Sequence, residues 1–244
     1  MVARVFSGIQ IAEQNGAGVA IAPASTGVTA FIGRTLKGPV DHPVVIHDFA
    51  TFHRLFGGLW QPATLGYAVE QFFENGGQTA IIVRVVNGAR PPTLTLGSGA
   101  AALTLAALAP GSREHLRAAI DHDGIGDNET DRFNLVVQRV RGNGSELVED
   151  QEIFRRVSVR PEAGRFVTVA LSESRLVRMV GAPPSERPAV TPPERPGDLV
   201  GYVNVGNDGD DGSPLTDYDV IGSAQQGTGL FALANAPPFN FLCI

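Results

Sequence analysis

The sequence predicts an α/β core with an inserted, mainly β domain, either a sandwich or a barrel, and an extended N-terminal arm. Three observations lead to this fold class. Residues 27 to 86 show the pattern strand, helix, helix, strand, which is typical of an α/β unit. Residues 93 to 181 instead contain short β-like segments separated by Gly, Asp and Asn. Residues 199 to 244 return to an α/β pattern, which indicates that the β region interrupts a single core.

The composition is that of a folded protein, with 43% hydrophobic and 18% charged residues. The net charge of −6 and the lack of a basic block argue against nucleic acid as the main partner. The single cysteine, Cys243, excludes an internal disulfide and suits a reducing compartment. The N-terminus has no signal-peptide pattern, and no apolar run reaches the roughly 18 residues of a membrane span. We therefore expect a soluble protein that is made in a cytoplasm and does not insert into a membrane.

Residues 1 to 20 predict the extended N-terminal arm. The stretch SGIQIAEQNGAGVAIAP has strand-like pieces that are interrupted by glycine, and it has no helical period. An extended segment of this kind leaves its backbone hydrogen-bonding groups open, so it can add a strand to a neighbouring sheet. The alternative is a frayed terminus, which is the ordinary state of a chain end in an isolated monomer.

Residues 21 to 90 predict an α/β unit that belongs to the core. A buried strand is expected over residues 27 to 35, followed by a turn and the short strand PVVI. Asp48 then caps a short helix, because its carboxylate can accept a backbone N–H bond. Gly57 and Gly58 end this helix, since glycine adopts the left-handed conformation without steric cost.

The stretch FGGLWQPATLGYAVEQFFENGGQTAIIVRV predicts a second helix and a strand. Pro62 suits the first turn of the helix. The apolar residues that follow have helical spacing, which predicts that one helix face packs on the sheet; they are Leu65, Ala68, Val69, Phe72 and Phe73. The sequence ENGG ends the helix, and a strand is expected over residues 79 to 86.

Residues 91 to 181 predict the inserted β domain, and residues 182 to 198 a Pro-rich linker or long loop. Residues 199 to 244 return to α/β character, with a short helical patch near residues 227 to 235 and a buried apolar strand over residues 239 to 244. A buried strand needs the rest of its sheet, so we expect an incomplete core and a chain that is the N-terminal portion of something longer. The segments of the β domain are TLTLGSG, ALTLAAL, LRAAIDH, FNLVVQRV, LVEDQEIFRRVSV, RFVTVAL and SRLVRMV.

Two kinds of motif in the sequence have the form of a binding site. GSGAAA at residues 97 to 102 fits a dinucleotide-binding fingerprint in form, but the helix that would have to open there is poorly amphipathic, and a β-turn is the simpler interpretation. DHDGIGDNETD (121 to 131) and NDGDDG (207 to 212) resemble calcium loops in composition only. Ile125 and Arg132 occupy positions of the first loop where an EF-hand needs oxygen ligands. Solvated acidic turns are therefore expected, with no metal site.

No pattern of catalytic or cofactor-binding residues emerges from the sequence. The five histidines lack metal-ligand spacing, and neither a nucleophile elbow nor a P-loop occurs. Nine arginines in residues 132 to 178 alternate with six acids, which favours a mixed, solvated β surface over a site for an anionic partner. We therefore predict no catalytic residue, no metal, no cofactor and no enzymatic activity.

The order of these segments resembles that of phage-type contractile tail sheath proteins, which also occur in tailocins and extracellular contractile injection systems. Such proteins begin with an arm similar to P-G-V-Y-V-E-E, followed by a T-S-V-A-A-F-V-G strand, G-P, F-x-x-F-x-x-x-F-G-G and a helix ending in N-G-G. This chain has SGIQIAE, TGVTAFIG, GP, FATFHRLFGG and ENGG in the same order. PGSREHLRAAID resembles their P-G-x-W-G-N-x-L-x-V-x-I segment, and GNDG their G-G-x-D-G loop. The resemblance spans essentially the whole chain.

The chain departs from the sheath pattern at several positions. Ser7 stands where the arm usually has proline, and Gln10 where an aromatic residue is common. SREH at residues 112 to 115 replaces W-G-N, which alters the packing expected at that turn. The resemblance implies that residues 199 to 244 are the start of the family's large α/β domain. The C-terminal half, which in the family completes this domain and contacts the inner tube, has no counterpart in these 244 residues.

The resemblance implies a structural subunit that polymerises as stacked hexameric rings around an inner tube and contracts to drive the tube through a target envelope. Its implied partners are further copies of itself, the tube protein, and baseplate and terminator proteins, with no nucleic acid. It implies a place in a virion tail or phage-tail-like particle after synthesis in the bacterial cytoplasm. The subunit-interaction arm would comprise Gly8, Ile9, Gln10, Ile11, Ala12 and Glu13.

Two other function classes remain open from the sequence. The first is an α/β enzyme with an accessory β domain, which would need a convergent polar site. The second is a binding module that decorates a particle, which would be a stable monomer with a dispensable arm. The sequence does not distinguish a phage from a tailocin or an extracellular injection system.

Overall fold

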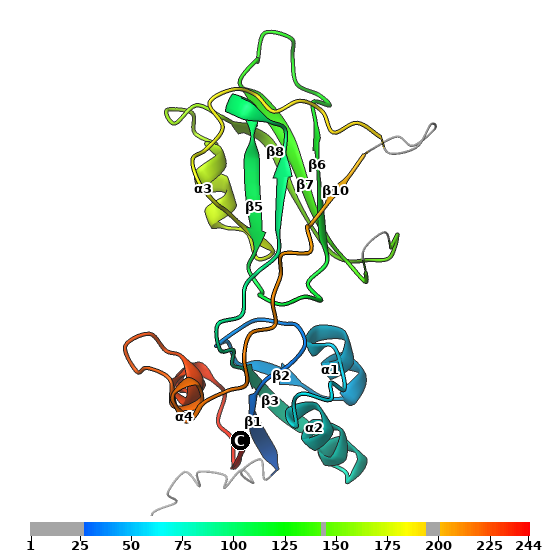
Figure 1. Ribbon diagram of the computed structural model, residues 1–244, viewed down its shortest axis with the longest axis vertical. Helices are drawn as coiled ribbons and strands as arrows, with labels where there is room; N and C mark the ends of the chain where they lie inside the picture. The colour runs from blue at the N-terminus through cyan, green and yellow to red at the C-terminus, as the bar shows by residue number, and fades with distance from the viewer. Residues whose placement is uncertain (1–26, 143–144, 194–200) are drawn as a thin grey trace, which may run out of the picture.

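The computed structural model describes residues 27–142, 145–193 and 201–244 and has two lobes, one above the other along its long axis (Figure 1). The lower one, the α/β lobe, contains β1, β2, β3, β11, α1, α2, α4 and η2. The upper one, the β lobe, contains β4 to β10, α3 and the short 3₁₀ helix η1 (Gly99–Ala101). The chain enters the β lobe after β3 and returns after β10, so the β lobe is an insertion between strands of the α/β lobe.

The α/β lobe is built on a four-stranded sheet in the order β11-β1-β3-β2. β1 (Val28–Gly33) lies parallel to both β3 (Thr79–Arg84) and β11 (Phe241–Cys243). β2 (Val44–Ile46) pairs antiparallel with β3. The central strands β1 and β3 are buried nearly throughout, which explains their continuous apolar sequences.

Helices cover both faces of this sheet. α1 (Phe49–Phe56) and α2 (Leu65–Glu74) pack on one face, while α4 (Asp217–Ile221) and the 3₁₀ helix η2 (Gly229–Asn235) pack on the other. Because successive strand residues point to opposite faces, neighbours on β1 and β3 belong to different cores. One core contains Phe31, Phe52, Phe56, Leu65, Val69 and Ile82, and the other contains Ile32, Val83, Val85 and Ala232.

The caps of α1 confirm the prediction from the sequence. The Asp48 carboxylate accepts a bond of 2.6 Å from the backbone N–H of Thr51. Gly57 ends the helix with φ of 93°, in the left-handed region, and its N–H donates to the carbonyl of His53. The start of α2 corrects the prediction: Pro62 lies in a turn, and the helix begins at Leu65 after Thr64. The predicted apolar stripe nevertheless faces the sheet.

The β lobe consists of two open sheets that enclose one apolar core (Figure 1). One sheet has the order β10-β6-β7-β8 and the other β4-β5-β9. Of the two forms predicted for this region, the described strands do not form a closed barrel. The strands are β4 (Thr93–Leu96), β5 (Leu103–Ala107), β6 (Leu116–Asp121), β7 (Arg132–Val140), β8 (Val148–Ser158), β9 (Val177–Met179) and β10 (Val203–Asn204).

One predicted β segment is a helix instead. The sequence RFVTVAL contains α3 (Val167–Ser172), which packs beside β8 and β9. Val167 and Leu171 are both buried in the core of the β lobe, four residues apart, while Val169 is exposed. The β-branched residues favour a strand locally, but burial of an i, i+4 pair against the two sheets outweighs this preference.

The described part of the Pro-rich segment, residues 182–193, is irregular and lies along the β lobe. The backbone N–H of Thr191 donates to the carbonyl of Ile120 at 2.9 Å, and the Thr191 hydroxyl accepts the Ile120 N–H at 2.9 Å. The backbone N–H groups of Ser185 and Glu186 both donate to the carbonyl of Ala100. These bonds hold the segment against the end of β6 and the β4–β5 connection.

Candidate assembly surfaces

The predicted subunit-interaction arm, Gly8 to Glu13, lies outside the described residues, as does the whole segment 1–26. Its proposed contacts with a neighbouring subunit therefore remain a prediction. The described surfaces that can serve assembly are the edge of the α/β sheet at β11, the junction between the lobes and the outer faces of the lobes.

β11 forms an edge of the α/β sheet. Its register on β1 pairs Thr29 with Phe241 and Phe31 with Cys243. The side chain of Asn240 fixes the start of this pairing, because its Oδ1 accepts the backbone N–H groups of Gly27 and Val28 at 3.0 and 3.1 Å. Among the described residues, no strand pairs with the other side of β11. An unpaired edge is a template for a further strand.

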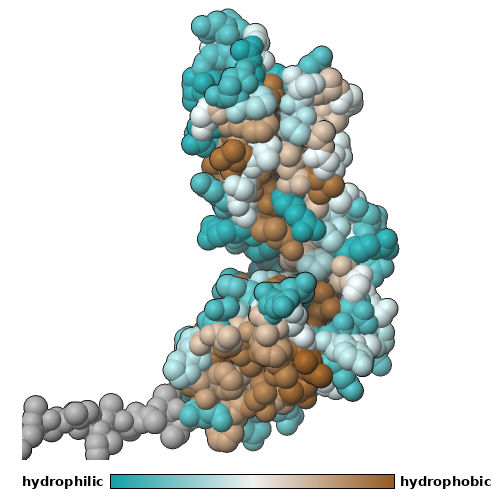
Figure 2. Space-filling model, turned by 90° about the vertical axis from the view of Figure 1, so that its left-hand side faces the viewer, coloured by the Kyte–Doolittle hydropathy of each residue, from teal (hydrophilic) through white to brown (hydrophobic). Residues whose placement is uncertain are grey.

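The side chains of the C-terminal strand are exposed, which corrects the prediction of a buried strand. Phe241 is 62% exposed, Ile244 is 69% exposed, and Leu242 is also exposed. The surface continues with exposed side chains on α4 and η2, among them Ile221 and Phe231. Figure 2 shows this side of the α/β lobe as a broad hydrophobic area. An exposed apolar patch of this kind is typical of an interaction surface.

A cavity of about 270 Å³ adjoins β11 at the carboxyl end of the sheet. It lies between the start of α2 and the segment that leads into α4, and its lining includes Pro62, Leu65, Val220 and Ile244. Nearly all of this lining is apolar, and the cavity has no pair of groups suited to acid–base chemistry. The cavity is therefore apolar, like the exposed hydrophobic surface beside it.

The acidic loop at residues 207–212 joins the two lobes. Asp208 accepts bonds from both the backbone N–H and the hydroxyl of Thr93, at 3.0 and 2.6 Å. Asp211 accepts the backbone N–H and the hydroxyl of Ser112, both at 2.8 Å. The bonds from Thr93 hold the pKa of Asp208 below its usual range. These two carboxylates therefore fasten the returning chain to the start of the β lobe.

No described cluster of His, Cys, Asp and Glu side chains, in this loop or elsewhere, has three members placed to hold a metal ion. The possible dinucleotide motif at residues 97–102 is a tight connection between β4 and β5, which are antiparallel. A dinucleotide site needs parallel strands and a helix at that point, so the β-turn interpretation holds.

Arg84, at the end of β3, is the central side chain of the interlobe junction. It is 1% exposed, and its Nη1 donates to the carbonyl of Gly38 at 2.7 Å. Burial lowers the pKa of the Arg84 guanidinium to about 10, while the carboxylates of Glu114 and Asp211 act in the opposite direction. Arg34 donates to the carbonyls of Asp211 and Gly212 at 3.0 and 3.1 Å.

Glu114 is a buried carboxylate of the β lobe at the same junction, and its charge favours the ionised form of Arg84. Its side chain is 1% exposed and accepts bonds of 2.7 Å from Arg139 on β7. Gly111 lies at the same point with φ of 132°, and a Cβ there would lie 3.1 Å from the Asp211 carboxylate. The junction was not predicted from the sequence, where its only signal is an arginine within the apolar strand TAIIVRVV.

The fold resembles that of known tail proteins. The sheath tail protein of Listeria innocua matches 89% of this chain and 40% of its own, with 14% identity and a TM-score of 0.53. The sheath tail protein of Desulfitobacterium hafniense also matches 89% of this chain and 41% of its own, with 14% identity and a TM-score of 0.47. The chain thus spans about 40% of the length of these structures.

Two further comparisons give no match. No protein-family model matches the sequence, and no curated protein matches it. The similarity to the Listeria structure is therefore one of fold, detected at an identity too low to carry residue-level roles. Among the described helices, none has the length and apolar character needed to cross a bilayer.

Proposed function

We propose that this chain is a structural subunit of a contractile tail sheath, and that it has no enzymatic activity. The observation that carries the proposal is the fold similarity to the Listeria sheath tail protein over 89% of the chain. The order of sequence motifs supports it independently, since it extends from the N-terminal arm to the last strand. In this function the subunits assemble as stacked hexameric rings around an inner tube and shorten in one stroke.

The interlobe junction suits a subunit that moves as one body. In the proposed contraction, the contacts between subunits change while each subunit keeps its shape. The work comes from a metastable extended packing of the subunits, and no nucleotide is consumed. Such a mechanism needs rigid subunits. The buried Arg84, the Glu114–Arg139 pair and the bonds of Asp208 and Asp211 supply rigidity where the two lobes meet.

The open edge of the α/β sheet suits flexible connections between such bodies. Strand addition makes main-chain hydrogen bonds with little dependence on side chains, so it can persist while the subunits rotate. We propose that residues 8–13 of the arm act in this way on a neighbouring subunit. The inner tube, baseplate and terminator proteins are the other proposed partners, in a virion tail or a phage-tail-like particle assembled after synthesis in the bacterial cytoplasm.

Electron microscopy of the protein, expressed from its complete gene, tests this proposal. We expect tubes or helical polymers, and a strictly monomeric solution at high concentration would overturn it. Deletion of residues 1–20 should abolish the polymers while the circular dichroism spectrum and melting temperature of the monomer stay the same. A deletion that unfolds the monomer would show instead that the arm is part of the core.

A further inference from the structure

A basic cleft of about 430 Å³ lies between α1 and the β lobe. Its lining carries the cationic side chains of Lys37, Arg54, Arg113 and Arg141, and its only carboxylate is Glu149. The whole chain, in contrast, has a net charge of −6. The cleft therefore concentrates positive charge on an otherwise acidic protein.

Two of these cations have no counter-ion in the described chain. Glu149 forms ion pairs with Lys37 at 3.0 Å and with Arg141 at 3.7 Å. Arg54 and Arg113 are both exposed, and neither forms an ion pair with any residue of the described ranges. Arg54 belongs to α1 of the α/β lobe, whereas Arg113 precedes β6 of the β lobe. An anionic group held by both would bridge the lobes.

The complementary surface is the acidic loop 121–131, at the outer end of the β lobe. Within it, Glu129 pairs with Arg132 and Arg156, and Asp131 accepts the hydroxyl of Ser158. The Asp121 carboxylate likewise accepts a hydrogen bond of 2.6 Å from the side-chain amide Nδ2 of Asn134. These interactions hold the loop in shape, and two of its acidic side chains take no part in them.

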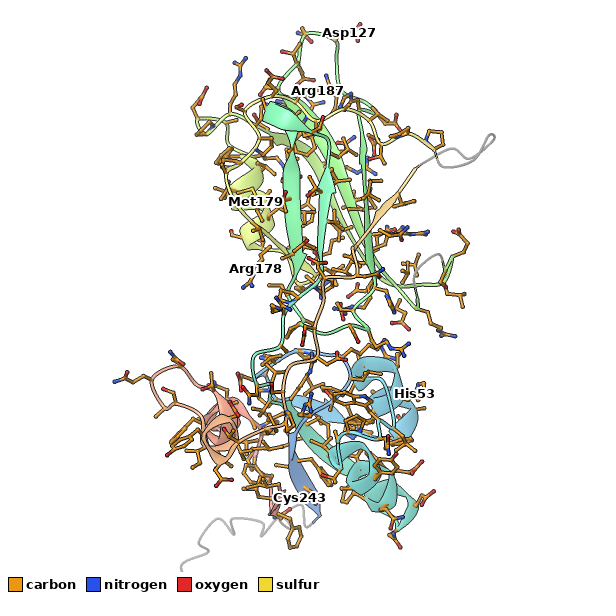
Figure 3. All side chains as sticks on the ribbon, viewed as in Figure 1. His53, Asp127, Arg178, Met179, Arg187 and Cys243 are labelled. Carbon is orange, nitrogen blue, oxygen red and sulfur yellow. The ribbon has the colours of Figure 1, made fainter. Side chains whose placement is uncertain are left out.

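The two remaining acids, Asp123 and Asp127, are exposed and form no ion pair within the described part of the chain. Asp127 lies at the far end of the β lobe, while His53, which lines the cleft, lies in the α/β lobe (Figure 3). The loop therefore cannot enter the cleft of its own chain. The two surfaces are complementary in charge, so the loop of one copy can pair with the cleft of another.

We propose that the basic cleft binds the acidic loop 121–131 of a second copy of this chain, with Asp123 and Asp127 facing Arg54 and Arg113. The contact joins two different surfaces, so it is head-to-tail: repeated between successive copies, it either closes into a ring or continues as a helix. It also fixes the two lobes of the receiving copy, because the cleft has walls from both. This inference rests on the proposed function only in assuming that copies assemble.

A labelled peptide of residues 121–131 tests the cleft on the whole chain by fluorescence anisotropy. We expect binding that weakens as salt rises from about 50 to 300 mM, since exposed charges are screened over a Debye length. Replacement of Arg54 and Arg113 by Glu should weaken binding about tenfold or more. The Arg178→Glu variant is the matched control, because Arg178 is an exposed arginine on β9 outside the cleft.

Charge reversal between two copies tests the contact itself. Neither R54E/R113E nor D123R/D127R should self-associate in sedimentation velocity, because each variant has lost one of the two complementary surfaces, but a mixture of the two variants should associate. Equal peptide binding by wild type and R54E/R113E, or equal association of all combinations, would overturn the proposal. Sheath-like polymers formed by R54E/R113E would overturn it too, while leaving the proposed function intact.

Discussion

Substitution of Glu114 by Gln should destabilise both lobes, because it removes the negative charge at their junction. The Glu114 side chain is 1% exposed and lies 2.7 Å from Arg139, which is 24% exposed. Removal of one partner of a buried ion pair costs about 3–5 kcal/mol. Arg139 can be partly rehydrated, but Arg84 cannot, since it is 1% exposed. We therefore expect a loss near the lower limit, about 3 kcal/mol in the free energy of unfolding.

Urea unfolding followed by two probes measures this effect. Trp60 is the only tryptophan and lies in the α/β lobe, so its fluorescence reports that lobe, while far-ultraviolet circular dichroism reports both. We expect both transitions of Glu114→Gln to move to lower urea. The control is Glu146→Gln, because Glu146 is 86% exposed and its pair with Arg117 should contribute less than about 1 kcal/mol. Equal stabilities of the two variants would refute the assignment of the junction as a buried charged core.

Three further predictions concern the core of the α/β lobe, the loop at residues 207–212 and the edge of the α/β sheet. Phe52→Ala should lower the free energy of unfolding by about 3–5 kcal/mol, since Phe52 is fully buried and stacks on Phe49 and Phe56; thermal melting would contradict this if the midpoint stayed the same. The hydrogen bonds from Thr93 lower the pKa of Asp208 in the folded state, so the stability that Asp208 contributes is present above its unfolded pKa of about 3.9 and is lost as pH falls through the lower folded value. Between pH 6 and 3, the free energy of unfolding in urea should therefore fall less for Asp208→Asn than for wild type. An identical pH dependence of the two proteins would argue against this role of Asp208. Phe241→Lys should reduce self-association in light scattering with a change in stability below about 0.5 kcal/mol, and undiminished scattering would exclude the edge from assembly.

The sequence predicted those elements whose local and tertiary preferences agree. The α1 helix has an N-cap at Asp48 and a left-handed glycine at Gly57, so its limits follow from short-range chemistry alone. The apolar stripe of α2 was predicted for the same reason, although the helix begins at Leu65 and not at Pro62. The strands β1 and β3 followed from their uninterrupted apolar sequences.

Prediction failed where the outcome depends on distant parts of the chain. α3 is helical because Val167 and Leu171 reach the core of the β lobe together, which no local pattern specifies. The junction was not predicted because Arg84, Glu114 and Asp211 are far apart in the sequence, and the residues next to each of them form no recognisable motif. The same holds for the basic cleft, whose arginines come from different lobes. Spacing rules apply to one helix or strand and cannot detect charges that meet through the fold.

The pairing of β1 with β11 also has a consequence for the order of events during synthesis. The bond between Val28 and Asn240 spans 212 residues, and the whole β lobe is translated between them. At about 5–20 residues per second, β1 waits roughly 10–40 s for its partner on that side. All strands of the β lobe are synthesised before β11. The β lobe can therefore fold while β1 still lacks its partner strand β11. Until β11 emerges, β1 is an unpaired edge of the nascent sheet and therefore a possible site of premature aggregation.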